Sequence, residues 1–180
     1  MLIDTDYKSD TTVQKKKLHQ IKKDADYLYS GMKDFVWSLD HKNDDLRYLQ
    51  IYLNDFGEQL FSLSNISFYS THNFTEQKTI LPFYWSKQLV LIFKEAMTNT
   101  LKHSEATKVL LKFTLKGNKL KIMLKDDGSG FTINTLQRVN GIQNMKHRAK
   151  TLHQKLIIET TNGTTITFIG NLKKNTNEQA

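Results

Sequence analysis

The sequence predicts an α+β protein, a two-layer sandwich of a mixed β-sheet covered by helices, preceded by a long N-terminal helix. Two kinds of periodicity point to this class. Apolar residues recur every three or four positions in the segments that should be helical, whereas period-two alternation around glycine turns marks two hairpins. The resulting order is long helix, helix, strand, helix, hairpin, glycine turn, helix and hairpin, which places the helices on one face of the sheet.

The first 60 residues are predicted to form two helices. Residues 1–12 are polar, and we expect them to be frayed. From Val13 to Leu39 the apolar residues form a narrow stripe, close to a coiled-coil seam. Short polar residues at 40–45 end this helix. The second helix is predicted from Asp44 to Ser62, with Leu46, Leu49, Leu53, Phe56 and Leu60 facing inward.

The rest of the chain is predicted to alternate between helices and strands. A short strand at 66–69 is followed by a loop at 71–80 and, after the only proline, by a helix at 84–103. One hairpin should join 109–115 to 120–124 through Gly117-Asn118, and another should join 155–161 to 164–172 through Asn162-Gly163. Between them a helix is predicted from Gly141 to Leu152. The polar tail from Lys173 is expected to be disordered.

Composition excludes several classes of protein. The chain has 180 residues and no cysteine, which excludes disulfides and thiolate metal sites. Met1 to Asp10 is polar and mixed in charge, unlike a signal peptide, and no apolar run has the length of a membrane span. The net charge of +8 comes from lysines that are scattered along the sequence. Without an arginine-rich block or an aromatic RNA-binding signature, we expect neither nucleic-acid binding nor direct membrane contact.

The first group of chemically capable residues lies on the predicted helix 84–103. Glu95, Asn99 and Lys102 are spaced i, i+4 and i+7, so they project from one stripe. A carboxylate and an amide oxygen one turn apart can hold Mg²⁺, directly or through water. Lys102 and His103 can then face phosphate oxygens. The alternative interpretation is the solvated face of an amphipathic helix.

The second group is the run from Asp126 to Phe131. Gly128 and Gly130 let the backbone turn sharply and approach a ligand closely. An aspartate that ends a buried strand can accept a hydrogen bond from a nucleobase amine. The run matches neither a Walker loop, a dinucleotide-binding loop nor a calcium loop. An ordinary turn remains the alternative.

Two further segments complete the candidate site. Gly141 opens a predicted helix, and free backbone N–H groups at such a start suit phosphate. A plain helix start capped by Asn140 is the alternative. The segment from Asn162 to Phe168 reads, taken alone, as an ordinary hairpin of β-branched residues.

Taken in order, these segments resemble the catalytic domain shared by histidine kinases, gyrase, Hsp90 and MutL. Residues 92–104 look like the N box of that superfamily, and they are most similar to sensor kinases related to the nitrate and membrane-fluidity sensors. The pattern Asn-Gly-hydrophobic-x-Asn-Met-x-x-Arg-Ala at 140–149 and the segment 35–44 resemble the same subfamily. The resemblance covers about residues 32–170.

The resemblance implies an ATP-binding site with Mg²⁺. Asp126 would recognise the adenine amino group, with Thr164 near the adenine, and Gly128 and Gly130 would shape the adenine pocket. Asn99 would bind Mg²⁺, and Glu95 would be the catalytic acid/base or metal-orienting carboxylate. The residues implied near the phosphates are Lys102, His103, Gly141 and Ile142.

The resemblance also implies a lid over the nucleotide, and the chain departs from the usual pattern at three positions, one of which is His41 in place of a proline common in the linker. The lid would run from Thr132 to Asn140. Asp127 stands where asparagine is usual and should add negative charge near the adenine. Val139 stands where a glycine is common and should stiffen the lid.

The implied function is phosphoryl transfer from Mg·ATP to a histidine outside this chain, and then to a response regulator. No phosphoacceptor motif occurs in the sequence, and His19 and His41 are interpreted as surface residues. Residues 1–40 would then be part of a dimerisation helix whose phosphoacceptor partner helix lies elsewhere in a homodimeric kinase. Residues 41–172 would be the catalytic domain and 173–180 a tail. We expect a chain that begins after the acceptor, or a natural protein without one.

Three other functions stay open at this level. A nucleotide-dependent regulatory module and an anti-sigma-type serine kinase use a similar domain, and a nucleic-acid binder is favoured by charge alone. The linker resemblance and the first helix favour the sensor kinase. The expected location of this segment is the cytoplasm, with the full-length protein anchored in the inner membrane.

Overall fold

The computed structural model describes residues 4–40, 44–75, 77–130 and 136–173. Contacts divide the chain between Leu39 and Asp40 into two units. The first unit is one helix, α1, which spans Asp4–Leu39. Residues 4–12, which were expected to be frayed, are part of this helix, and their fraying stays a prediction. Neither glycine nor proline occurs in the sequence of its first turns.

Helix α1 carries the apolar stripe that its sequence predicts. Leu18, Ile21, Leu28 and Met32 are each about two-thirds exposed within this unit. Dimerisation through this stripe stays a prediction. Among the described helices of either unit, none is both long enough and apolar enough to span a membrane.

The second unit is built on a five-stranded mixed sheet with the strand order β1-β2-β3-β5-β4. Strands β1 and β2 pair in parallel, and the other neighbours pair antiparallel. Both predicted hairpins are confirmed, whereas β1 extends three residues beyond the predicted strand. The strands are β1 (Ser67–His72), β2 (Lys108–Lys116), β3 (Lys119–Asp126), β4 (Lys155–Glu159) and β5 (Thr165–Asn171).

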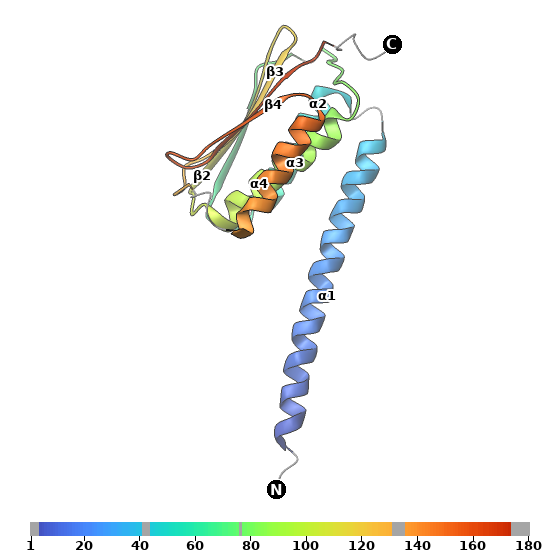
Figure 1. The fold of residues 1–180 in the computed structure, drawn as a ribbon, viewed down its shortest axis with the longest axis vertical. Coiled ribbons are helices and arrows are strands. Elements are labelled where there is room, and N and C mark those ends of the chain that lie inside the picture. Colours follow the sequence, from blue (N-terminus) through green and yellow to red (C-terminus); the bar gives the residue numbers. More distant parts are fainter. Residues whose placement is uncertain (1–3, 41–43, 76, 131–135, 174–180) are drawn as a thin grey trace. The chain divides into compact units, whose positions relative to one another are not determined.

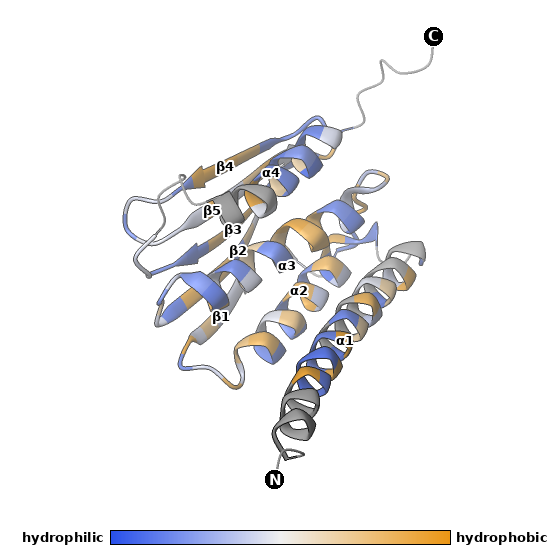
Figure 2. Ribbon diagram, turned by 60° about the horizontal axis from the view of Figure 1, so that its bottom comes forward, coloured by the Kyte–Doolittle hydropathy of each residue, from blue (hydrophilic) through white to orange (hydrophobic). Residues whose placement is uncertain are grey.

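Three helices cover one face of this sheet, so the predicted sandwich is confirmed (Figure 1). They are α2 (Leu46–Phe61), α3 (Trp85–His103) and α4 (Leu136–Thr151). They lie side by side, with α3 in the centre in contact with both neighbours (Figure 2). The inward positions of β2 and β3 are fully or almost fully buried beneath them: Val109, Leu111, Phe113, Leu120, Ile122 and Leu124.

Helix α2 begins one residue after its cap. The Asp45 side chain accepts a hydrogen bond from the Arg47 backbone N–H at 3.0 Å, which satisfies one of the free donors of the first turn. Leu46, Leu49 and Leu53 are buried as predicted. The prediction was wrong further along the helix, where Gly57 and Phe61 are buried and Phe56 and Leu60 are only half-buried.

That change of face has a local cause. A Cβ on Gly57 would lie 2.3 Å from the ring of Phe68, so the missing side chain lets β1 pack directly on α2. The burial stripe therefore follows the glycine rather than Phe56. Lys94 of α3 instead lies over the Phe56 ring, 4.5 Å from its centroid.

The predicted start is nearly correct for helix α3 and wrong for helix α4. Helix α3 begins at Trp85, one residue after the predicted start, and buries Val90, Phe93 and Met97 against the sheet. Helix α4 begins at Leu136, five residues before the predicted start at Gly141. Part of the expected lid is therefore helical, and residues 132–135 of that lid lie outside the described residues.

Candidate functional site

A pocket opens where the C-terminal half of α3 meets the end of β3, the middle of α4 and the start of β5. It combines buried apolar residues with a few polar groups, which is usual for small-molecule sites. Its lining residues are Ala96, Asn99, Thr100, His103, Ser104, Asp126, Gly130, Ile142, Met145, Thr164 and Ile166. The fold therefore brings together segments that lie up to 70 positions apart in the sequence.

Asp126 supplies the carboxylate of this pocket and is only 3% exposed. Its Oδ1 accepts hydrogen bonds from the backbone N–H of Thr164 at 2.9 Å and of Gly128 at 3.1 Å. Its Oδ2 lies 3.1 Å from the Thr100 hydroxyl. A buried carboxylate whose other partners are hydrogen-bond donors of the protein can accept a further hydrogen bond from a ligand in the pocket, which suits a ligand with an N–H donor.

Thr100 is a pocket residue that the sequence prediction missed. Its hydroxyl lies within hydrogen-bond distance of both Asp126 Oδ2 and the Ala96 carbonyl, 3.2 Å away. It lies one turn after Ala96 and one turn before His103, which is one of the predicted residues. Helical spacing from His103 was therefore the signal that could have found it.

Glycines allow the backbone around Asp126 to pack closely. A Cβ on Gly128 would lie 2.0 Å from the Ser104 carbonyl oxygen, at the C-terminal end of α3. A Cβ on Gly163 would lie 2.1 Å from the Asp126 carbonyl oxygen, and Gly163 has a φ of +80°. Gly128 thus lets the turn pack closely against the end of α3, and it does not line the pocket. Gly130 does line the pocket. Gly163, predicted only as a turn residue, lets the turn before β5 approach the Asp126 backbone, although it does not itself line the pocket.

Asp127, which was expected to add negative charge near the adenine, does not line the pocket. Its carboxylate accepts hydrogen bonds at 2.8 Å from the backbone N–H groups of Thr107 and Lys108 and from the Thr107 hydroxyl. The Lys108 N–H and the Thr107 hydroxyl hold the pKa of the Asp127 carboxyl below its ordinary value. The charge is therefore used to hold the loop that leads into β2.

Glu95 and Asn99 lie one turn apart, as predicted. The Asn99 amide donates to Glu95 Oε1 at 3.2 Å, so the Asn99 Oδ1 is the oxygen left to face a cation. Of the two, only Asn99 lines the pocket. Within the described residues, no group of three histidine or acidic side chains forms a metal site. A cation at Asn99 could take its other ligand atoms from water or from a bound molecule.

Gly141 contacts the same pair from α4. A Cβ at Gly141 would lie 2.2 Å from Glu95 Oε1 and 3.4 Å from the Asn99 amide nitrogen. Because α4 begins at Leu136, Gly141 lies in the second turn, and its N–H is not one of the free donors of a helix start. The reason given for its role in phosphate binding was therefore wrong, although its position beside Glu95 and Asn99 agrees with a place at the site.

The two basic residues at the end of α3 differ in position. His103 and Lys102 are both exposed, and His103 lines the pocket while Lys102 does not. Ile142 and Thr164, two of the predicted site residues, also line it. Met145 and Ile166, which the prediction missed, supply apolar walls. Such walls suit the face of a flat aromatic ligand.

Comparisons with known proteins agree with this geometry. Residues 86–174 match the family described as histidine kinase-, DNA gyrase B-, and HSP90-like ATPase. The sensor protein VraS of Staphylococcus aureus is 39% identical over 62 residues, which cover 34% of this chain and 18% of VraS. The sensor histidine kinase ComP of Bacillus subtilis is 37% identical over 78 residues, 42% of this chain and 10% of ComP. The matches thus span a small part of either relative.

Solved structures share the fold. A histidine kinase domain from an Erythrobacter litoralis blue-light activated kinase aligns with a TM-score of 0.58 and 18% identity, over 69% of this chain and 61% of that one. The Acinetobacter baumannii histidine kinase AdeS aligns with a TM-score of 0.62 and 10% identity, over 87% and 84%. With the sequence match and the pocket, these findings lead to one assignment. Residues 86–174 belong to the family of histidine kinase-, DNA gyrase B- and HSP90-like ATPases.

Proposed function

We propose that this chain is the ATP-binding catalytic part of a two-component sensor histidine kinase. It would bind Mg·ATP in the pocket and serve transfer of the γ-phosphoryl group to a histidine outside this chain, and from there to a response regulator. The observation that carries the proposal is the buried Asp126 carboxylate at an otherwise largely apolar pocket.

The adenine end of the proposed site is the part around Asp126. Its Oδ2 can accept the exocyclic amine of adenine while the N–H groups of Thr164 and Gly128 hold Oδ1. Met145 and Ile166 would contact the faces of the ring. An amine donor meets a charged acceptor there, and a ligand with a carbonyl at that position would be repelled.

The phosphate end is proposed along α3 and the facing part of α4. Asn99 would hold Mg²⁺ through its Oδ1, oriented by its hydrogen bond to Glu95. Lys102 and His103, at the end of α3, would offset phosphate charge, and Gly141 and Ile142 would bring the α4 backbone close. When bound, Mg·ATP supplies the phosphoryl group and the cation that neutralises its charge. The residues of this chain contribute positioning and electrostatics.

Nucleotide binding tests the site. Calorimetry with about 1 mM Mg·ADP should give a saturable signal with a dissociation constant in the micromolar range. Absence of heat, together with absence of thermal stabilisation, would mean that the pocket is not a nucleotide site.

Phosphoryl transfer is tested separately with γ-labelled ATP. The isolated chain should not label itself, whereas a separately supplied phosphoacceptor helix should gain an acid-labile label. An acid-stable label on a partner protein would instead identify a serine kinase. Nucleotide binding without transfer to any acceptor would favour a regulatory module.

A further inference from the structure

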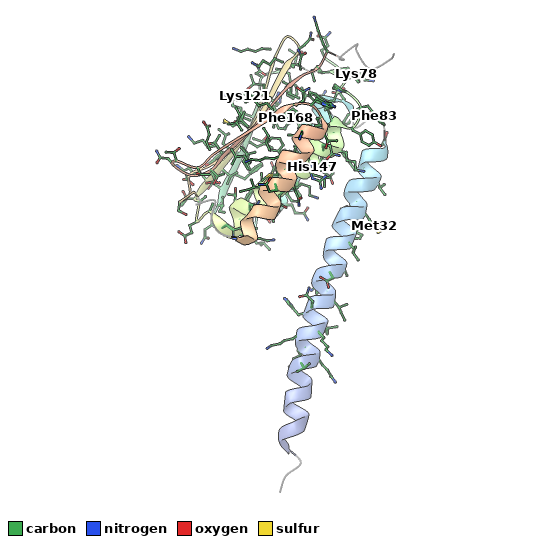
Figure 3. The ribbon with its side chains drawn as sticks, viewed as in Figure 1. Met32, Lys78, Phe83, Lys121, His147 and Phe168 are labelled. Atoms are coloured by element: carbon green, nitrogen blue, oxygen red, sulfur yellow. The ribbon has the colours of Figure 1, made fainter. Side chains whose placement is uncertain are left out.

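The face of the sheet opposite the helices carries a row of lysines. Because side chains alternate along a strand, the residues between the buried positions of β2 and β3 all point to this outer face. Six of them are exposed lysines, named here the lysine face: Lys108, Lys112, Lys116, Lys119, Lys121 and Lys125. Figure 3 labels one residue of each side, Phe168 toward the helices and Lys121 away from them.

The strand register gathers these lysines although they are spread over 18 positions of sequence. Lys116 pairs directly with Lys119, Lys121 pairs with Thr114, and Lys112 pairs with Met123. No acidic residue occupies an outward position of β2 or β3. Like charges placed opposite each other in a sheet are unfavourable, so the fold itself gains nothing from this arrangement.

Apolar groups lie among the lysines. Tyr69 of β1 is 53% exposed and pairs with Leu110, which in turn pairs with Lys125. Leu110 and Met123 are half-buried. In the described part of this unit, α2, α3 and α4 all lie on the other side of the sheet (Figure 1). The lysine face is therefore a surface of two neighbouring strands with lysines along its whole length and half-buried apolar groups among them.

We propose that the lysine face binds the surface of an anionic lipid bilayer. A bilayer needs no shape complementarity, and it attracts clustered lysines with a strength that adds up over the cluster. Recognition of individual phosphates or of nucleic acid favours arginine forks and several stacking aromatics, whereas the cations of β2 and β3 on this face are all lysines. Tyr69 has the amphipathic side chain that suits the headgroup level. This replaces the expectation, made from scattered lysines, that the segment makes no membrane contact.

Vesicle co-sedimentation of the full chain tests the proposal. The chain should bind phosphatidylcholine vesicles that contain about 30% phosphatidylserine, bind neutral phosphatidylcholine vesicles much less, and be released by about 0.5 M salt. The triple variant K112E/K121E/K125E should lower the partition coefficient by roughly a hundredfold, since each cation near such a surface contributes about a fivefold factor.

A matched control uses lysines of α1. The triple variant K15E/K16E/K17E changes the net charge of the chain equally, and these residues are exposed on the other unit. It should retain most of the binding. Thermal unfolding of both triples, and of a neutral K112Q/K121Q/K125Q variant, checks that the fold is kept.

Three results would overturn the proposal. The first is equal binding to neutral and anionic vesicles. The second is a loss of binding in the α1 control that matches or exceeds the loss in the lysine-face variant. The third is binding to an RNA homopolymer, abolished by the lysine-face variant, with no binding to anionic vesicles; this would assign the face to nucleic acid.

Discussion

Asp126 and Asp127 are neighbours in sequence, yet they lie in opposite environments at the end of β3. Asp126 is buried and directs its charge into the pocket, where three donors hold it. Asp127 is exposed on the other side of the strand and binds the backbone of Thr107 and Lys108. Strand alternation produces this difference, because successive side chains point to opposite faces. Identical side chains thus acquire different roles, ligand recognition for one and loop fixation for the other.

The largest expected effect is a loss of stability in Gly163→Ala, which tests the close packing around Asp126. The new Cβ would collide with the Asp126 carbonyl oxygen, and φ would remain in a region that alanine disfavours. We expect a loss of about 3 kcal/mol in the free energy of unfolding, from overpacking and backbone strain together. Urea denaturation followed by Trp85 fluorescence in a Trp37→Phe background measures it, since Trp85 contacts the Phe168 ring.

Gly117→Ala is the matched control for that prediction. Gly117 also has a positive φ, of +55°, but nothing lies within 4 Å of an added Cβ. Gly117→Ala should lose about 1 kcal/mol in the free energy of unfolding, which is the part due to backbone conformation alone. Equal losses in the two variants would show that the close approach to Asp126 contributes nothing.

The comparison of the two aspartates is tested most directly by Asp126→Asn and Asp127→Asn. Under the proposed function, the first should weaken Mg·ADP binding by roughly ten- to a hundredfold, because a charged acceptor in a buried site is lost. The second should change affinity by less than about twofold. Calorimetry measures the affinity of both variants for Mg·ADP. If the two affinities fall equally, the assignment of distinct roles to the two aspartates is incorrect.

A smaller effect is expected from Thr100→Val, which removes the hydroxyl beside Asp126 Oδ2 with little change in shape. Two backbone donors still hold Oδ1, so affinity for Mg·ADP should fall only about fivefold. Thr100→Ser keeps the hydroxyl and should bind as the wild type does. Weak binding by the serine variant would point to packing of the Thr100 methyl group instead of its hydrogen bond.

The smallest expected effect is the contribution of Asp127 to the pH dependence of stability. The pKa of Asp127 is lowered in the folded protein, mainly by the Lys108 N–H and the Thr107 hydroxyl. Its ionised form therefore stabilises the fold above about pH 4, and this contribution is lost as the pH falls through the lowered pKa. The difference in unfolding free energy between wild type and Asp127→Asn should be constant near neutrality and shrink in acid. A difference that grows in acid would contradict this.

Local sequence signals predicted most of the fold. Strand periodicity and the Gly117 and Gly163 turns gave both hairpins, and helical periodicity gave α3 almost to the residue. The errors occurred where tertiary contacts override such signals. The inward face of α2 follows Gly57 because the Phe68 ring packs there, and no property of α2 alone reveals that ring. Helix α4 begins at Leu136, before Gly141. A glycine can stand at the start of a helix, but it can also lie within one, so Gly141 did not mark the first residue of α4.

The candidate site divides in the same way. The residue types at Glu95, Asn99, Asp126 and Gly130 and their order along the chain indicated a nucleotide site. Thr100, Met145 and Ile166 were missed because their sequence signals are those of ordinary helix and strand residues. They became pocket residues only when α3, α4 and β5 met.

The sequence by itself determined the class of fold, the motifs of the pocket and the net charge of +8, because periodicity, turn chemistry and composition are local properties. Only the tertiary structure decided where charges lie. It separated Asp126 from Asp127 through strand alternation, and it gathered scattered lysines on one face through the register of β2 and β3. Both outcomes depend on which side of a strand faces the helices, and the packing of the helices on the sheet settles that.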